Sequence, residues 1–252
     1  MVYLLKNAGP ERQVAVIVST LDTFQSSTID LANRRSLAAQ ASGGISGDAI
    51  YQAVLRAVND FQLRGDLLDF GSGTAFLTEQ LKATKLFTTV AAADLLPRPA
   101  SLDESIAWTA ADLNESLPYD SASFDVIVAA EVIEHLENPR FVAREMFRLL
   151  RPGGALILTT PNNESWRSLI SLLARGHHVA FGDSSYPAHI TPLLRIDLQR
   201  ILTEAGFHPP LFRYTEEGGL PGYPTITWQK ISAGLLTGLR FSDNLLAFSL
   251  KR

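Results

Sequence analysis

The fold is decided by one stretch, Leu67-Leu68-Asp69-Phe70-Gly71-Ser72-Gly73-Thr74-Ala75-Phe76-Leu77, in which an apolar run meets an acid, two close glycines and a helical pattern. Gly71 and Gly73 allow the backbone to turn sharply and to approach a ligand closely. A helix that begins near Thr74 points unpaired N–H groups at a carboxylate or a phosphate. The stretch therefore predicts a strand, a turn and a helix that together hold a cofactor.

The residues around the turn favour a cofactor that is cationic at this point. A dinucleotide-binding turn prefers a third glycine where this chain has Phe76. Asp69 stands two residues before the first glycine, where its carboxylate would repel a diphosphate and attract an ammonium group. A glycine-rich turn without any ligand is the alternative for the motif taken alone.

Acidic residues follow the next two expected strands. Residues 88–93 indicate a buried second strand that ends at Asp94, about twenty residues past the glycines, where an acid can accept hydrogen bonds from both ribose hydroxyls. Taken alone, Asp94 could equally be a helix cap or a loop residue. Residues 108–113 indicate a short third strand with Asp112 at its mouth.

The remaining pattern continues the alternation of strands and helices. Residues 123–130 predict a fourth strand, and a helix is expected to open at Glu131. Residues 149–154 make a turn into a fifth strand over residues 155–160, and residues 244–250 predict the last strand. This alternation is typical of an α/β fold.

The motifs in this order resemble those of the class I S-adenosylmethionine-dependent methyltransferases, over about residues 67–207. The first motif of that family, D/E-x-G-x-G-x-G, is matched by residues 69–75, with Ala75 at the third glycine. The resemblance implies a doubly wound, seven-stranded and mostly parallel sheet with the last strand antiparallel. It also implies S-adenosylmethionine as the cofactor, with an acid at Asp112 taking the adenine amino group. The cofactor contacts it implies are Asp69, Gly71, Ser72, Gly73, Asp94, Leu95, Asp112, Leu113 and Glu131.

Glu131, Glu134 and His135 form the sharpest chemical cluster, since positions i, i+3 and i+4 of a helix share one face. In one interpretation the main chain near Glu131 contacts the methionine moiety, while His135 acts as a base or orients the acceptor. In a second, these residues and His189 bind a metal, as in the small-RNA 3′-terminal 2′-O-methyltransferases, which resemble the chain here. In a third, Glu134 and His135 are structural. We predict a metal-free site with Glu134, His135 and His189 in catalytic roles, below a lid formed by residues 165–192.

Composition limits the class of protein. The chain has 252 residues, 46% of them hydrophobic, which suits one domain over residues 1–252. Within it we expect a lead-in (1–47), a cofactor-binding half (48–161) and a substrate-side half (162–252). The net charge of −4 argues against a nucleic-acid surface. The absence of cysteine excludes disulfides and favours a cytoplasmic protein, and no apolar run reaches membrane-spanning length.

We therefore predict a methyltransferase that acts on a small molecule or on a carrier- or lipid-linked acceptor, with an oxygen acceptor slightly favoured over nitrogen. The alternatives are a metal-dependent RNA 3′-terminal 2′-O-methyltransferase and a non-catalytic cofactor-binding protein on the same fold. A third, an NAD-dependent enzyme, is disfavoured by Asp69, Phe76 and Asp112. The sequence leaves the identity of the acceptor and the oligomeric state open.

Overall fold

The computed structural model describes residues 30–252. The chain divides into two compact units, Met1–Leu37 and Ala38–Arg252. In the first unit the described residues, 30–37, are helical. Most of the expected lead-in lies outside the described residues, so the single domain over residues 1–252 stays a prediction. Every feature that follows belongs to the second unit.

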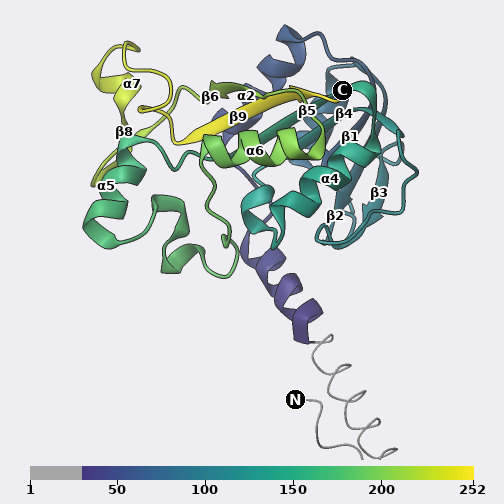
Figure 1. Ribbon diagram of the computed structural model, residues 1–252, viewed down its shortest axis with the longest axis horizontal. Helices are drawn as coiled ribbons and strands as arrows, with labels where there is room; N and C mark the ends of the chain where they lie inside the picture. The colour runs from purple at the N-terminus through teal and green to yellow at the C-terminus, as the bar shows by residue number, and fades with distance from the viewer. Residues whose placement is uncertain (1–29) are drawn as a thin grey trace, which may run out of the picture. The chain divides into compact units, whose positions relative to one another are not determined.

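A sheet of seven strands forms the centre of this unit, in the order β3-β2-β1-β4-β5-β9-β6. The strands along β3 to β5 pair in parallel, whereas β9 pairs antiparallel with both β5 and β6. The predicted topology, including the antiparallel last strand, is confirmed (Figure 1). The strands are β1 (Gly65–Phe70), β2 (Phe87–Asp94), β3 (Ala107–Ala110), β4 (Phe124–Ala130), β5 (Leu150–Pro161), β6 (Leu211–Tyr214) and β9 (Asn244–Leu250).

Helices cover both faces of the sheet, because the buried residues of its central strands are apolar on both sides. Leu68 and Ile127 pack in one core with α4 (Pro139–Leu149) and α6 (Arg195–Ala205). Helices α2 (Asp48–Asp60) and α3 (Phe76–Ala83) pack in a second core that contains Leu67 and Val126. Neighbouring residues of one strand thus face opposite cores, as a doubly wound fold requires.

Smaller elements follow β4, β5 and β6. They are α5 (Trp166–Arg175), three single-turn 3₁₀ helices η1 (Ile133–His135), η2 (Val179–Phe181) and η3 (Asp183–Ser185), the hairpin β7 (Gly219–Leu220) and β8 (Tyr223–Thr227), and α7 (Trp228–Ile231). No helix among the described residues has the length and apolar character needed to cross a bilayer.

Candidate active site

The two glycines of the turn after β1 stand where no side chain fits. Gly71 and Gly73 have positive φ angles of +84° and +53°. A Cβ atom at Gly71 would lie 2.3 Å from Cγ2 of Val132, and one at Gly73 would lie 2.2 Å from the carbonyl oxygen of Gly44. Both positions therefore need glycine for conformation and for space.

The segment before α2 packs on this turn. The backbone N–H and the hydroxyl of Thr74 both donate to the carbonyl oxygen of Gly44, at 3.0 and 3.2 Å. Helix α3 begins at Phe76, two residues later than expected, because Ala75 has a left-handed φ of +66°. An alanine in this conformation costs about 1–2 kcal/mol, which explains physically why a glycine suits the position.

Asp69 lies beneath the turn and is buried, with 1% of its surface exposed. The hydroxyl of Thr78, on α3, donates to its Oδ2 at 2.5 Å. Burial raises the pKa of this carboxyl to about 7, and the neighbouring Asp94 adds to the rise, although the Thr78 hydrogen bond opposes it. A cationic ligand group nearby would favour the ionised form.

Asp94 closes β2 and is tied to the glycine turn. Its Oδ2 accepts from the backbone N–H of Gly73 at 2.7 Å, and its Oδ1 accepts from that of Leu96 at 2.8 Å. Burial raises the pKa of Asp94 despite these bonds. Ser72 stabilises the same turn, because its hydroxyl lies within hydrogen-bond distance of the carbonyl oxygens of Asp69 and Ala93. The side chain of Ser72 thus bonds to the protein itself.

The third acid of the predicted cofactor site follows β3, which is the strand next to β2. Asp112 is half-buried, and its Oδ1 accepts from the backbone and side-chain N–H groups of Asn114 at 2.9 and 3.0 Å. Leu113 is buried in the core beside the sheet, and Leu95 follows Asp94 half-buried. The glycine turn, Asp94 and Asp112 thus stand at the carboxyl ends of three consecutive strands, where open α/β sheets bind ligands.

The expected helix at Glu131 is wrong. Glu131 has a left-handed φ of +55°, and only the single turn η1 follows before α4 begins at Pro139. The side chain of Asn138 caps α4 by accepting from the N–H of Phe141, and Pro139 occupies its first turn. The proposed helical face for Glu131, Glu134 and His135 therefore does not exist.

The half-buried Glu131 and the fully buried Glu134 nevertheless lie close enough to interact. Glu131 accepts from the hydroxyl of Thr159 at 2.8 Å and from the side-chain amide of Asn244 at 2.7 Å. Glu134 accepts from the hydroxyl of Thr160 at Oε2, at 3.1 Å, while its buried Oε1 has no hydrogen-bond partner. Burial raises the pKa of Glu131 to about 7, and burial together with Glu131 raises the pKa of Glu134 well above its usual range.

His135 and His189 lie edge to face, with ring centroids 4.7 Å apart. Nδ1 of His135 lies 2.8 Å from the carbonyl oxygen of Ala188, and Nδ1 of His189 lies 2.7 Å from that of Ala180. Because a carbonyl can only accept, each Nδ1 carries the proton and each neutral ring has its lone pair on Nε2. Burial lowers the pKa of both rings, so both are neutral bases near pH 7.

Three of these side chains could hold a metal ion. Ligand atoms of Glu134, His135 and His189 lie within 4.8 Å of one another. Both histidines present Nε2 while a carbonyl fixes Nδ1, as metal-ligating histidines usually do. Glu131 is not in this group, since its two carboxylate oxygens bond to Thr159 and Asn244.

Residues 165–192 pack against the turn that carries the histidine. The carbonyl oxygen of Glu134 accepts from the backbone N–H groups of Ile190 and Thr191 at 2.9 and 3.0 Å. His177 and His178 bond within their own segment, to the carbonyl oxygen of His178 and to the hydroxyl of Ser168. Residues 188–191 of the segment thus contact the turn that carries His135, and the role of the segment as a lid stays a prediction.

Sequence reasoning missed the polar residues that hold the buried acids: Thr78, Thr159, Thr160 and Asn244. Each bond joins residues of separate elements, and only Thr78 lies close in sequence to its partner, Asp69. The two threonines near the end of β5 stand at the end of an apolar run, and buried polar residues in such a run indicate a hydrogen-bond partner elsewhere in the fold. This was the sequence signal that could have found them.

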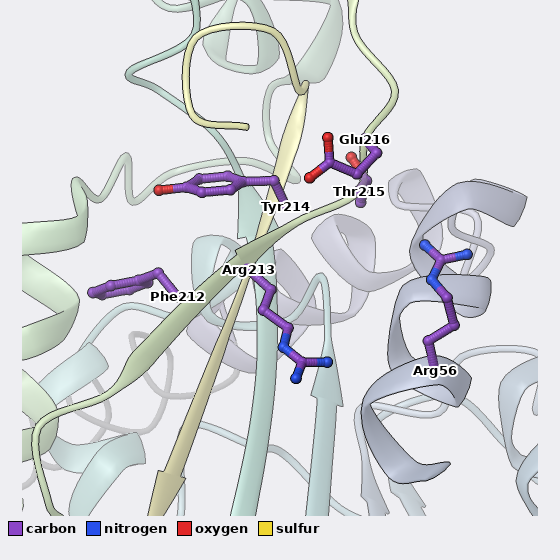
Figure 2. Close-up of a pocket in the computed structure, with 6 residues that line it drawn as sticks. All are labelled: Arg56, Phe212, Arg213, Tyr214, Thr215 and Glu216. Carbon is purple, nitrogen blue, oxygen red and sulfur yellow. The ribbon is translucent and has the colours of Figure 1, made fainter. Parts of the chain in front are cut away.

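A separate open cavity of about 590 Å³ lies between α2 and β6. Figure 2 shows Arg213 of β6 pointing toward α2, while Phe212 and Tyr214 point to the other side. Arg213 forms an ion pair with Asp60 at 2.5 Å. None of the candidate site residues lines this cavity, and we assign no chemistry to it.

Comparison with known families identifies the central part of the chain. A family model described as a methyltransferase domain matches residues 43–209. The chain is 36% identical over 103 residues to the malonyl-[acyl-carrier protein] O-methyltransferase of Hahella chejuensis. This match covers 38% of this chain and 36% of that protein. It is 30% identical over 146 residues to the ubiquinone biosynthesis O-methyltransferase of Xanthomonas oryzae. This match covers 51% of this chain and 60% of that protein. The chain thus matches only part of the length of these relatives.

Solved structures share the fold at low identity. A SAM-dependent methyltransferase from Thermotoga maritima, described as a possible histamine N-methyltransferase, superposes with a TM-score of 0.59 at 17% identity, covering 80% of this chain and 89% of that one. The 1,6-didemethyltoxoflavin-N1-methyltransferase of Burkholderia thailandensis, solved with S-adenosylhomocysteine, superposes with a TM-score of 0.52 at 16% identity. The match covers 98% of this chain and 92% of that one. At this identity the likeness establishes the fold.

Proposed function

We propose that this chain, which belongs to the class I S-adenosylmethionine-dependent methyltransferases, transfers a methyl group to a small-molecule or a carrier- or lipid-linked acceptor, with oxygen favoured. The observation that carries the proposal is the convergence of the glycine turn, Asp94 and Asp112 at the ends of β1, β2 and β3. The two O-methyltransferase relatives support the oxygen preference, although each matches only in part.

The residues present fit this cofactor by their chemistry. Asp69 offers a buried carboxyl that a cation would ionise, and Asp94 and Asp112 offer acceptors for hydroxyl and amino groups. The turn itself brings main-chain groups close to the ligand. We assign the main chain at Gly71, Ser72, Gly73, Leu95, Leu113 and Glu131 to the same site. The bound cofactor supplies an electrophilic methyl group on a sulfonium.

In the proposed mechanism the protein acts mainly by positioning. His135 removes the acceptor's proton at Nε2, because Ala188 holds the other ring nitrogen and burial keeps the ring neutral. His189 presents a second Nε2 beside it and orients the acceptor. Burial and the neighbouring Glu131 raise the pKa of the Glu134 carboxyl, and in its protonated form this group can donate a hydrogen bond. The lid excludes water from the transfer step.

A direct test measures methyl transfer itself. Protein is incubated with methyl-labelled S-adenosylmethionine and a panel of phenol, carboxylate and amine acceptors, and S-adenosylhomocysteine is quantified. We expect turnover with at least one oxygen acceptor and its loss in Asp94→Ala. Binding of S-adenosylhomocysteine without turnover on any acceptor would favour the non-catalytic alternative on the same fold.

The cluster of Glu134, His135 and His189 favours a second candidate, a metal-dependent methyltransferase in which a divalent cation holds the acceptor, as for the 3′-terminal ribose of an RNA. Three protein ligands with a further open position suit such a role. The net charge of −4 argues against RNA as the acceptor. Elemental analysis of the purified protein separates the candidates: stoichiometric metal that is lost in His189→Ala, and activity abolished by a chelator, would replace our first proposal with the second.

A further inference from the structure

The glycine turn after β1 keeps its own backbone donors occupied. Each of the five consecutive N–H groups of residues 71–75 has an acceptor within the protein. Four of these donors bond within the turn or to the end of β2, at Ser72, Ala93 and Asp94. The fifth donor, Thr74, is different, because its acceptor lies 30 residues earlier in the chain.

That acceptor is Gly44, in the segment of residues 42–47 that precedes α2 and that we call the strap. The backbone N–H and the hydroxyl of Thr74 both donate to the carbonyl oxygen of Gly44, at 3.0 and 3.2 Å. The contact is close, since a Cβ atom at Gly44 would lie 3.0 Å from Cα of Gly73. The strap therefore rests directly on the turn that we assign to the cofactor.

Hydrogen bonds, and not apolar packing, hold the strap in place. None of residues 42–47 is buried, and the apolar side chain of Ile45 is 67% exposed. Besides the two bonds from Thr74, the N–H of Ser46 donates to the hydroxyl of Tyr51 at 2.7 Å. Because a single hydrogen bond contributes little net stability, a segment held in this way opens far more often than the packed strands beneath it.

The composition of the strap gives it freedom to move. Gly43 and Gly47, near its two ends, stand where a Cβ atom would meet nothing within 4 Å. Gly47 has a φ angle of −71°, which any residue adopts, so neither space nor conformation requires glycine there. Glycine does, however, leave the backbone less restricted than any other residue would. Tyr51, which holds Ser46, is buried in α2, so the strap lies against fixed neighbours.

We propose that the strap is a gate for the cofactor: it lifts from Thr74 when the cofactor enters or leaves the glycine turn, and it seats again to retain the bound cofactor. The inference rests on the proposed function, because it takes this turn as the cofactor site. The alternative is a fixed wall, which would keep Gly44 and Thr74 together at all times. The two differ in how often the bonds of Thr74 break.

Amide exchange of the full wild-type chain, followed residue by residue by NMR, tests the movement. We expect the Thr74 N–H to exchange at least about tenfold faster than those of Gly71 and Ala75, since only Thr74 depends on the strap. The N–H groups of Gly71 and Ala75 are the internal controls, because each bonds at 2.8 Å to an acceptor in β2 or in the turn. Saturating S-adenosylhomocysteine should slow the exchange of Thr74, because the bound ligand favours the closed strap.

Binding kinetics test the gate itself. Thr74→Val removes the hydroxyl bond to Gly44 and keeps the branched side chain. Loss of one hydrogen bond shifts a gate toward its open state, so the rates of binding and of release of S-adenosylhomocysteine should both rise, by about fivefold. Stopped-flow mixing measures both rates by tryptophan fluorescence, since Trp108 packs in one cluster with Ala75 of the turn.

Thr89→Val is the matched control and should leave both rates unchanged, because the exposed hydroxyl of Thr89 donates to Asp66 at 2.7 Å, near the amino end of β2. Equal exchange at Thr74, Gly71 and Ala75 would overturn the gate. So would a binding rate that Thr74→Val leaves unchanged, since a fixed wall predicts a change in release alone. A chain that binds no S-adenosylhomocysteine would overturn the gate and the proposed function together, whereas absence of methyl transfer with these kinetics intact would count against the proposed function only.

Discussion

At the scale of single residues, the candidate site is dominated by acids that the protein interior pushes toward their neutral forms. Asp69 and Glu131 have pKa values raised to about 7 by burial, and each keeps one threonine hydroxyl as a donor. A buried carboxylate without a cation is unfavourable, and a bound cation relieves it. We infer that the burial of these carboxyl groups is tolerated because a bound cationic ligand stabilises their ionised form.

Asp94 gives the first prediction. Asp94→Ala should weaken binding of S-adenosylhomocysteine by about 1–3 kcal/mol, because ligand hydroxyls lose their acceptor. The same change also frees the N–H of Gly73, so part of the loss would come from the turn. Calorimetry measures the affinity, and Asp103→Ala, an exposed acid beside Lys82, is the control. Unchanged affinity in Asp94→Ala would remove this residue from the site.

His135 gives the second. His135→Ala should leave the affinity for S-adenosylhomocysteine nearly unchanged and lower kcat by roughly 10²–10⁴-fold, the usual contribution of a positioned base. Steady-state kinetics with an acceptor, together with calorimetry, separates the two quantities. His208→Ala, outside the candidate site, is the control. If melting temperature and cofactor affinity fall together in His135→Ala, the residue is structural and positioning alone remains.

At the scale of elements, the site is a set of strand ends joined by one glycine turn. The turn contacts three elements at once: Gly71 fits against Val132, Gly73 against Gly44, and Asp94 of β2 accepts from Gly73. The segment before α2 is thus part of the site. We expect cofactor affinity to depend on the seating of this segment as much as on the strand ends.

The third prediction compares two glycines of similar conformation. Gly73 and Gly153 have φ angles of +53° and +75°, so alanine is strained at both. A Cβ atom at Gly153 meets nothing within 4 Å, whereas one at Gly73 would collide with Gly44. Gly153→Ala should therefore cost only about 1–2 kcal/mol of stability, and Gly73→Ala should in addition abolish measurable cofactor binding. Calorimetry and melting check both, and wild-type affinity in Gly73→Ala would contradict the assignment of the turn.

Elements with a strong local signal could be predicted from the sequence, and contacts between elements could not. The strands of residues 88–93, 123–130 and 244–250 were correct to within a few residues because each is an apolar run that ends at turn residues. The helix at Glu131 was wrong because helical spacing of polar residues says nothing about a left-handed φ. The pair Asn138-Pro139 was the local signal for the true start of α4.

At the scale of the whole molecule, buried acids link stability to pH. The native state keeps the proton of Asp69 up to about pH 7, whereas the unfolded chain releases it near the ordinary value of 3.8. The native state therefore binds more protons between these values, and this group's contribution to stability is lost as pH rises through 7. Three histidines, His135, His178 and His189, have lowered pKa values and act in the opposite direction. Below about pH 6.5 the unfolded chain binds more protons at these groups than the native state does, so their contribution to stability is lost as pH falls.

The fourth prediction isolates this effect. Asp69→Asn keeps the shape of the side chain and its bond to Thr78 but cannot ionise. Relative to wild type, it should gain free energy of unfolding as pH rises from 5 to 8, by about 2–3 kcal/mol, while losing affinity for the cofactor. Chemical denaturation at several pH values measures the difference. A difference that is constant with pH would mean that Asp69 ionises normally in the folded protein.

The central claim is that the turn after β1, with the acids after β2 and β3, binds S-adenosylmethionine. Titration calorimetry of the wild-type chain with S-adenosylhomocysteine and, separately, with NADH tests it most directly. We predict one site per chain for S-adenosylhomocysteine, with heat that disappears in Gly73→Ala, and no binding of NADH, because Asp69 would repel a diphosphate at the turn. Tight binding of NADH with no binding of S-adenosylhomocysteine would contradict the account.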